Sequence, residues 1–178
     1  VTFSINKSNA VTSVSESLKQ DTLRLFDIKN EIKVVPNFID IEKHEPNFTD
    51  CQRSAMANED ERIITHISNF REVKNIPDVI KIFYGIQKEI PAKLMMVGEG
   101  PEKEPAENLV EELGISDKVV FFGNSNEIDR ILCFSDLFLL PSETESFGLA
   151  ALEAMASSVP VISSNSGGLS EVNKDGFS

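Results

Sequence analysis

The chain has 178 residues, a formal net charge of −12, 40% hydrophobic residues and 26% charged residues. This composition is typical of a globular chain of about one domain, long enough to bury a sizeable core. The acidic charge argues against a general nucleic-acid or anionic-membrane surface, so an anionic ligand needs a local basic site. No apolar run is long enough to span a membrane, and the N-terminus has no signal-peptide pattern.

The two cysteines, Cys51 and Cys133, lie far apart in the sequence and indicate neither a disulfide framework nor a metal motif. A reducing, cytoplasmic location is therefore the default expectation. The histidines also lack a partner at metal-binding spacing, because His44 lies in a polar stretch and His66 inside an apolar run typical of a packed strand. We predict no metal site.

The first part of the chain contains two short β-like runs and one helix. The run at 10–14 precedes a helix at 16–26, which Ser15 would cap. This helix directs three apolar side chains toward a core: Leu18, Leu23 and Phe26. A strand at 32–35 then ends at a connector, and the very polar residues 42–61 are predicted to form a surface loop.

From Arg62 onward, apolar runs alternate with helical patterns. Strands are predicted at 63–67, 93–97, 118–122, 137–140 and 159–162, and helices at 75–89, 105–113, 127–133 and from about Ser146. This order predicts an α/β domain, a Rossmann-like parallel sheet with helices on both faces. Ligands of such sheets lie beyond the carboxyl ends of the strands. The loops of interest are therefore 68–75, 98–101, 123–126, 141–147 and 163–168.

The stretch 139–156, LLPSETESFGLAALEAMA, runs from a strand through a polar turn into a helix. The free amides and the positive dipole end of the helix favour a phosphate, and Gly148 permits close approach to its backbone. Glu145 and Glu153, with seven residues between them, offer carboxylates to hydroxyl groups. The combination suits a sugar nucleotide, and the alternative is an ordinary capped helix with two solvated glutamates.

The loop after the first strand of the alternation carries Arg71 and Lys74. In an acidic chain these two cations suit a diphosphate, with the arginine as a fork and the lysine as a point charge. The alternative is a pair of solvated loop cations.

Three other loops contain glycines. Gly123 and Asn124 are placed to bring backbone groups to a base edge, a pattern that is not specific by itself. The sequence VGEGP at 97–101 lacks the third glycine of a dinucleotide fingerprint and favours a tight strand-to-helix turn. Gly167-Gly168 indicates a close backbone approach where a last helix opens.

Together these motifs resemble the C-terminal lobe of a GT-B glycosyltransferase of the retaining family 4. The resemblance rests on Arg71 and Lys74, VGEGP at 97–101, FFG at 121–123, GGLSEV at 167–172 and above all ESFGLAALEAMA at 145–156, which contains the E-x7-E motif of the family. It covers nearly the whole chain. It implies three parts: residues 1–32 as the end of the N-terminal lobe, 33–41 as an interlobe linker, and 42–178 as a C-terminal nucleotide-sugar-binding lobe that is truncated at its C-terminus.

The resemblance also implies catalytic roles for three side chains. Arg71 and Lys74 would hold the diphosphate and stabilise the UDP leaving group in place of a metal, so no cofactor is expected. Glu145 would hydrogen-bond to hydroxyl groups of the donor sugar.

Further residues would bind the donor. Glu153 would accept hydrogen bonds from the ribose hydroxyls, and the backbone around Gly123 and Asn124 would read the base. Four consecutive residues would place their backbone near the sugar and phosphate: Ser146, Phe147, Gly148 and Leu149.

Within the family, the chain looks most like the enzymes of bacillithiol biosynthesis that transfer N-acetylglucosamine from a UDP-sugar to L-malate. The expected partners are therefore a UDP-sugar donor and a small acceptor, with a homodimer as an expectation for the full-length protein. The chain alone is not expected to turn over, because the acceptor lobe is missing. The alternatives are an enzyme like UDP-N-acetylglucosamine 2-epimerase, or a non-catalytic nucleotide-binding module. The sequence departs from the family pattern at Ser158, a frequent glycine, and at Ser170, a frequent proline.

Overall fold

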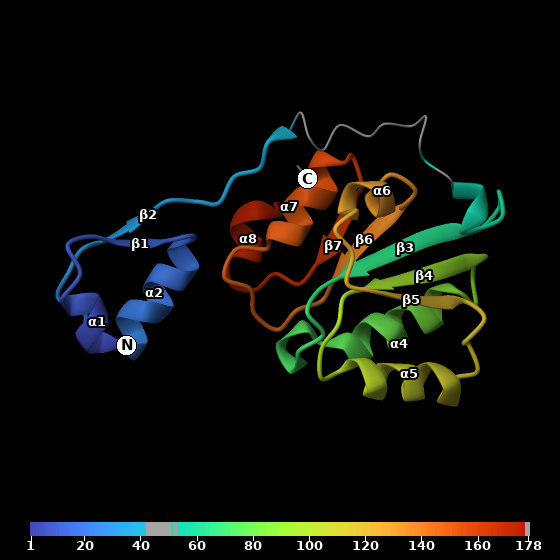
Figure 1. Ribbon diagram of the computed structural model, residues 1–178, viewed down its shortest axis with the longest axis horizontal. Helices are drawn as coiled ribbons and strands as arrows, with labels where there is room; N and C mark the ends of the chain where they lie inside the picture. Colours follow the sequence, from blue (N-terminus) through green and yellow to red (C-terminus); the bar gives the residue numbers. More distant parts are fainter. Residues whose placement is uncertain (42–50, 52, 177–178) are drawn as a thin grey trace.

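The computed structural model describes residues 1–41, 51 and 53–176, which form two parallel sheets (Figure 1). The small sheet pairs β1 (Val11–Ser13) with β2 (Ile32–Val34). The large sheet has five strands in the order β5-β4-β3-β6-β7. Their bounds are Arg62–Ile67 for β3, Ala92–Val97 for β4, Val119–Gly123 for β5, Leu137–Leu140 for β6 and Val161–Ser163 for β7. The predicted α/β fold with a parallel sheet is confirmed.

All five strands are parallel, but the direction in which the chain adds strands to the sheet reverses once. From β3 the chain builds outward through β4 to β5, and then crosses back to place β6 on the other side of β3. In open α/β sheets, ligands bind at the carboxyl ends of the strands that flank such a switch point. A ligand site is therefore expected at the loops after β3 and β6.

Helices cover both faces of the large sheet, with α4 and α5 on one side and α6 and α7 on the other (Figure 1). After β3, the chain forms η3 (Glu72–Lys74), α4 (Ile76–Ile86), α5 (Lys103–Glu112), α6 (Ile128–Leu132), α7 (Leu149–Ala156) and α8 (Leu169–Val172). The helices before β3 are α1 (Thr2–Asn6), α2 (Glu16–Leu25) and the 3₁₀ helix η2 (Arg53–Ala55). No helix within the described ranges is both long and apolar enough to cross a bilayer.

The alternation of side chains along β3 and β4 divides the core into two layers. Leu94 and Met96 pack with the buried face of α4, whereas Met95 and Val97 pack with Ile131 of α6 on the opposite face. Successive residues of a strand point to opposite faces, so strands covered on both sides are mainly apolar along their length. This explains why the sequence signal for these strands was a continuous apolar run.

The N-terminal helix α2 matches its predicted cap but not its predicted burial. The Ser15 hydroxyl accepts a hydrogen bond from Leu18 N at 3.0 Å, which confirms the N-cap. No residue of α2 is buried, and Leu23 is 41% exposed, so the prediction that Leu23 faces a core is wrong. The reason is that the two-stranded sheet beside α2 is too small to cover an apolar face.

The central helix begins later than predicted, at Leu149 rather than near Ser146. Gly148 occupies the N-cap with φ of 96°, a conformation that L-residues rarely adopt, so the helix cannot extend backward through it. At its other end, Ser158 has φ of 61°. The helix end thus needs a left-handed residue, which accounts for the glycine that the family pattern has at this position.

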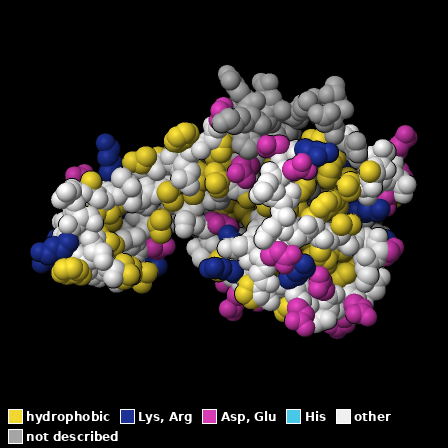
Figure 2. All heavy atoms as spheres, in the orientation of Figure 1, with side chains coloured by type: hydrophobic (Ala, Val, Ile, Leu, Met, Phe, Trp, Pro, Cys, Tyr) yellow, Lys and Arg dark blue, Asp and Glu magenta, His cyan; other side chains and the backbone are white. Residues whose placement is uncertain are grey.

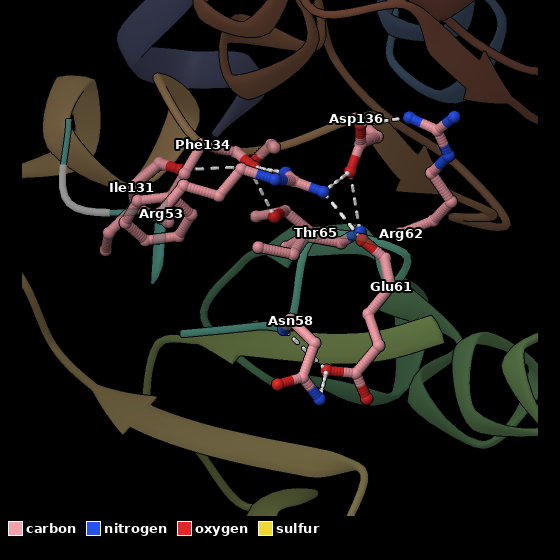
Figure 3. Close-up of polar contacts among 10 residues, drawn as sticks. Arg53, Asn58, Glu61, Arg62, Thr65, Ile131, Phe134 and Asp136 are labelled. Carbon is pink, nitrogen blue, oxygen red and sulfur yellow. Dashed lines mark hydrogen bonds and ion pairs between the residues drawn. The ribbon is translucent and has the colours of Figure 1, made fainter. Parts of the chain in front are cut away.

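A cluster of charged groups ties the chain together at the amino ends of β3 and β6 (Figure 3). Arg53 donates to the Asp136 carboxylate at 2.8 Å and to the carbonyl oxygens of Phe134 and Glu61, both at 2.6 Å. Arg62 donates to the other oxygen of Asp136 at 3.1 Å. Partial burial raises the pKa of Asp136, but hydrogen bonds from the Ile63 backbone and the two arginines outweigh it and hold the pKa below its ordinary value.

The predicted surface loop at 42–61 falls largely on residues 42–50 and 52, which lie outside the described residues. Within the described remainder, Cys51 forms a disulfide with Cys133 of the α6 end, at a Cα–Cα distance of 6.0 Å. The expectation that the two cysteines form no disulfide framework is therefore wrong. Sequence separation did not reveal the pairing, because it depends on how the chain returns past α6. The cysteine argument for a reducing compartment also fails, and the cytoplasmic location stays a prediction.

Candidate functional site

The loops that follow β3, β6 and β7 are hydrogen-bonded to one another at the carboxyl edge of the sheet. Glu143 N donates to Val73 O at 2.9 Å and joins the loops after β6 and β3. Gly168 N donates to Glu145 O at 2.7 Å and joins the loops after β7 and β6. Because backbone groups make these contacts, the three loops form one continuous surface at the switch point.

Glycines allow the loop after β3 to lie against the turn after β4. A Cβ at Gly98, where φ is 129°, would lie 1.7 Å from Ser68 O, and one at Gly100 would lie 2.1 Å from Asn69 O. Glu102 N also donates to Phe70 O at 2.9 Å. The VGEGP segment is therefore a tight turn, as the sequence favoured, and it supports the segment that carries Arg71.

Gly167 and Gly168 support the loop after β6 in the same manner. A Cβ at Gly167 would lie 2.4 Å from Glu145 O, and one at Gly168 would lie 2.3 Å from Ser146 O. The close backbone approach expected at these two glycines is confirmed. Its partner is the backbone of the E-x7-E loop itself.

A cleft of about 250 Å³ opens between these loops and helix α2. The loops after β3 and β6 line it with Asn69, Arg71, Val73, Lys74, Thr144, Glu145 and Ser146. Helix α2 lines it with Ser17, Leu18 and Asp21. The structure thus brings together four predicted site residues that are separated by up to 75 positions in the chain. Figure 2 shows basic side chains on the side of the larger lobe that faces the N-terminal segment.

Lys74 and Glu145 form an ion pair at the wall of this cleft. Their side chains are only 19% and 14% exposed, and the Ser142 hydroxyl donates to the same Glu145 oxygen at 3.1 Å. Low exposure strengthens the attraction between opposite charges and restricts both side chains. The pair therefore presents one cation and one carboxylate in fixed positions.

Arg71 differs from Lys74, because its guanidinium is exposed and has no hydrogen-bond or ion-pair partner among the described residues. It precedes the short helix η3, on which Lys74 lies. A cationic fork without a protein partner is available to an anion in the cleft.

Six predicted site residues do not line this cleft: Gly123, Asn124, Phe147, Gly148, Leu149 and Glu153. Phe147 is buried, and a Cβ at Gly148 would lie 2.5 Å from the Leu169 side chain. The group that approaches Gly148 closely is thus Leu169 of α8. Gly123 has φ of 66° and accepts a hydrogen bond from Gly98 N at 2.8 Å, which joins the loops after β5 and β4.

The residues on the α2 side of the cleft were not predicted from the sequence. The Ser15 hydroxyl, which caps α2, donates to Ser146 O at 2.6 Å. The Glu171 carboxylate of α8 accepts from Glu16 N at 3.0 Å and from Ser17 N at 2.8 Å. An N-cap serine was visible in the sequence, but no local pattern shows that two distant loops meet it.

Within the described part of the chain, no group of three or more His, Cys, Asp or Glu side chains is arranged to hold a metal ion. The cleft offers instead the exposed Arg71 and the Lys74–Glu145 pair. It also offers one serine from α2, one serine from the E-x7-E loop, and Asp21. Cations suit a phosphate, and carboxylates and hydroxyls suit the hydroxyl groups of a sugar.

Solved structures that superpose on this chain include GT-B glycosyltransferases. The structure of Anabaena HepE with UDP and glucose superposes with a TM-score of 0.89 at 20% identity, covering 98% of this chain and 50% of that one. A mutant TarM of S. aureus, solved with fondaparinux, alpha-GlcNAc-glycerol and UDP, gives a TM-score of 0.78 at 26% identity, covering 96% of this chain and 33% of that one. The fold is therefore that of one lobe of a GT-B glycosyltransferase.

Residues 48–178 match the family described as Glycosyl transferases group 1, and the chain belongs to this family. It is 43% identical over 177 residues to the N-acetyl-alpha-D-glucosaminyl L-malate synthase of Bacillus anthracis, covering 99% of this chain and 46% of that protein. An uncharacterized glycosyltransferase of Methanocaldococcus jannaschii is 32% identical over 180 residues, covering 97% of this chain and 46% of that protein. The chain thus spans about half the length of the curated relatives it matches.

Proposed function

We propose that this chain is the donor-binding part of a retaining glycosyltransferase that transfers N-acetylglucosamine from a UDP-sugar to L-malate. The observation that carries the proposal is the convergence of Arg71, Lys74 and Glu145 on one cleft at the switch point of the sheet. The name of the Bacillus anthracis relative supports the sugar and the acceptor. The family match also favours a transferase over an epimerase.

Arg71 and Lys74 would bind the donor diphosphate. Cleavage of the bond between the sugar and the phosphate places growing negative charge on the departing UDP oxygen. Positively charged groups held in place before the reaction lower this barrier, because they need no reorganisation when the charge develops. Lys74 is already oriented by Glu145, and Arg71 is available to a second phosphate oxygen.

Glu145 would accept hydrogen bonds from hydroxyl groups of the donor sugar, while its other interactions keep Lys74 near the phosphate. Ser142 and Gly168 N hold this residue from two sides, through its side chain and its carbonyl oxygen. The backbone of Ser146 to Leu149 would border the sugar and the phosphate.

The nucleoside would extend toward the loop after β5. Glu153 would accept from the ribose hydroxyls, and the backbone around Gly123 and Asn124 would contact the base. Both assignments follow the E-x7-E pattern and the strand order, in which β4 and β5 extend the sheet from β3.

We also propose that the chain contains parts of two lobes and the linker between them. Residues 1–32 would be the end of the N-terminal lobe, 33–41 the interlobe linker and 42–178 the C-terminal nucleotide-sugar-binding lobe. The acceptor would bind mainly to the N-terminal lobe of the full-length protein, for which a cytoplasmic location and a homodimer are part of the proposal.

Calorimetric titration with UDP tests the site. Replacing Arg71 or Lys74 with alanine should weaken UDP binding about tenfold or more, since each removes a charge-assisted hydrogen bond to phosphate. Glu153→Ala should also weaken UDP binding, because it removes the proposed hydrogen bonds to the ribose hydroxyls. The control is Lys81→Ala, which changes an exposed lysine of α4 paired with Asp78.

ADP, GDP and NAD serve as competing ligands in the same titration. Unchanged UDP affinity in all three site variants would contradict the site assignment, and preferential NAD binding would contradict the function. With the full-length protein, consumption of the UDP-sugar in the absence of any acceptor would favour an epimerase.

A further inference from the structure

We propose that His66 is a positioning residue for the donor site, which anchors the loop carrying Arg71 and Lys74 to the sheet through the Ser68 hydroxyl. This inference rests on the proposed function, and it concerns a residue that touches neither the cleft nor the proposed ligand. The sequence indicated only a packed strand histidine.

His66 lies on β3, is 0% exposed and uses both of its ring nitrogens. Nδ1 lies 2.9 Å from Leu139 O, and Nε2 lies 2.8 Å from Ser68 Oγ. A carbonyl oxygen can only accept, so Nδ1 carries the proton and donates. In the neutral ring Nε2 is then an acceptor, and the Ser68 hydroxyl donates to it.

The second contact of Ser68 explains why this orientation matters for the loop. With its proton directed to His66, Ser68 Oγ accepts a hydrogen bond from Phe70 N at 3.3 Å. Phe70 is fully buried and has φ of 36°, a conformation that is unfavourable for a bulky residue. Such a backbone persists only where its surroundings hold it, and the His66–Ser68 pair supplies one of those restraints.

Arg71 follows Phe70 directly, and Lys74 lies three residues further along η3. A change in the Phe70 backbone would therefore redirect the Arg71 side chain and displace Lys74 from Glu145. On its other side, His66 contacts Leu139 of β6, two residues before the loop that carries Glu145 begins. The ring thus connects the two strands on either side of the switch point.

The protonation state agrees with this hydrogen-bond direction. Burial lowers the pKa of His66 to about 4, the bond to the Leu139 carbonyl opposes this shift, and the positive charge of Lys74 adds to it. The ring is therefore neutral near pH 7, and Nε2 is free to accept from Ser68.

Two amide variants separate the two contacts of His66. His66→Gln places an amide oxygen as many bonds from the backbone as Nε2, and so keeps an acceptor for Ser68. His66→Asn places an amide nitrogen as many bonds away as Nδ1, and so keeps a donor for Leu139 but loses Ser68. Ser68→Ala removes the contact from the other side. Thr65→Val is the matched control, since buried Thr65 bonds to Ser135 on the opposite face of β3, at 2.6 Å.

The full-length protein is measured in two ways: UDP affinity by calorimetry, and amide hydrogen exchange over residues 69–74 without ligand. We expect His66→Asn and Ser68→Ala each to weaken UDP binding about tenfold and to raise exchange at Phe70 N, as loss of a buried hydrogen bond predicts. The double variant should be no weaker than either single one. His66→Gln should bind UDP nearly as the unchanged protein does, and Thr65→Val should lower only the melting temperature.

Equal effects of His66→Gln and His66→Asn, additive effects in the double variant, or unchanged exchange in the loop would each overturn the proposal. If the unchanged protein binds no UDP, the proposed function fails. Hydrogen exchange then still decides whether His66 holds the loop.

Discussion

The Lys74–Glu145 pair joins two residues for which the sequence predicts different ligand groups. The sequence motifs predict that the lysine binds phosphate and that the glutamate binds sugar hydroxyls, each independently of the other. The structure joins them, with Ser142 donating to the same carboxylate oxygen. A paired and partly buried charge loses less freedom on ligand binding than a mobile surface charge does. The pairing thus pre-organises the cleft.

His66 also makes stability depend on pH. Its pKa is lowered from 6.5 to about 4 in the folded state, mainly by burial, so the unfolded chain binds more protons between these values. The stability that follows from keeping His66 neutral is fully present above pH 6.5. As the pH falls below 6.5 this stability is lost, and at pH 4 the free energy of unfolding is lower by about 3 kcal/mol. Urea unfolding at pH 7.5 and pH 4.5 should show this loss in the unchanged protein and a clearly smaller one in His66→Gln.

The comparison between the two proteins removes the contribution of carboxylates. Asp136, whose pKa lies below its ordinary value, loses its stabilising effect only at still lower pH and does so in both. An identical pH dependence of the unfolding free energy in both proteins would show that His66 is not buried in the neutral form.

At the scale of elements, the site is made of loops that are held by glycine turns. The turn at 98–100 supports the loop after β3, and the Gly167-Gly168 turn supports the loop after β6. The strands and helices set the distance between these loops, and the glycines allow backbones to approach where a Cβ would not fit.

Gly167→Ala should therefore destabilise the protein by about 2–4 kcal/mol, because the new Cβ meets backbone and the residue must keep a positive φ. Gly85→Ala is the control: this helical glycine has nothing within 4 Å of its ideal Cβ position, and it should stabilise by about 0.5–1 kcal/mol. Denaturant unfolding measures both changes. A Gly167→Ala variant as stable as the unchanged protein would show that the loop after β6 is free to shift.

At the scale of the whole molecule, polar contacts among the described residues hold the N-terminal segment 1–34 against the part of the chain that forms the five-stranded sheet. The Glu171 carboxylate accepts from the first two amides of α2, and Ser15 donates to Ser146 O. The carboxylate lies where the positive end of the helix dipole favours negative charge. These contacts hold α2, which lines the cleft, against the E-x7-E loop and α8.

Glu171→Ala should open the cleft, since it leaves the first amides of α2 without their partner. We expect amide exchange at Glu16 and Ser17 to rise about tenfold, as for the loss of one charge-assisted hydrogen bond. The radius of gyration from small-angle scattering should rise with it. Ser170→Ala is the control on the same helix, because this hydroxyl bonds to Gly167 O and, among the described residues, to no other group. Equal exchange in both variants would mean that other contacts hold the segment.

The sequence by itself determined the strands and most helices from Arg62 onward, the parallel α/β fold and the glycosyltransferase family. These features follow from local patterns: apolar runs of strand length, helical spacing and short motifs such as ESFGLAALEAMA. Boundaries moved where the backbone needed a special conformation, as at Gly148.

Only the tertiary structure decided which groups meet. The ring of His66 contacts a carbonyl 73 residues away, Ser15 reaches Ser146 across 131 residues, and Cys51 pairs with Cys133 across 82. The exposure of Leu23 likewise depends on what lies beside α2 and not on its own periodicity. Such contacts arise from how strands are ordered in the sheet, and no local pattern records that order. The motifs therefore indicated candidate site residues, and the fold determined which of them are paired.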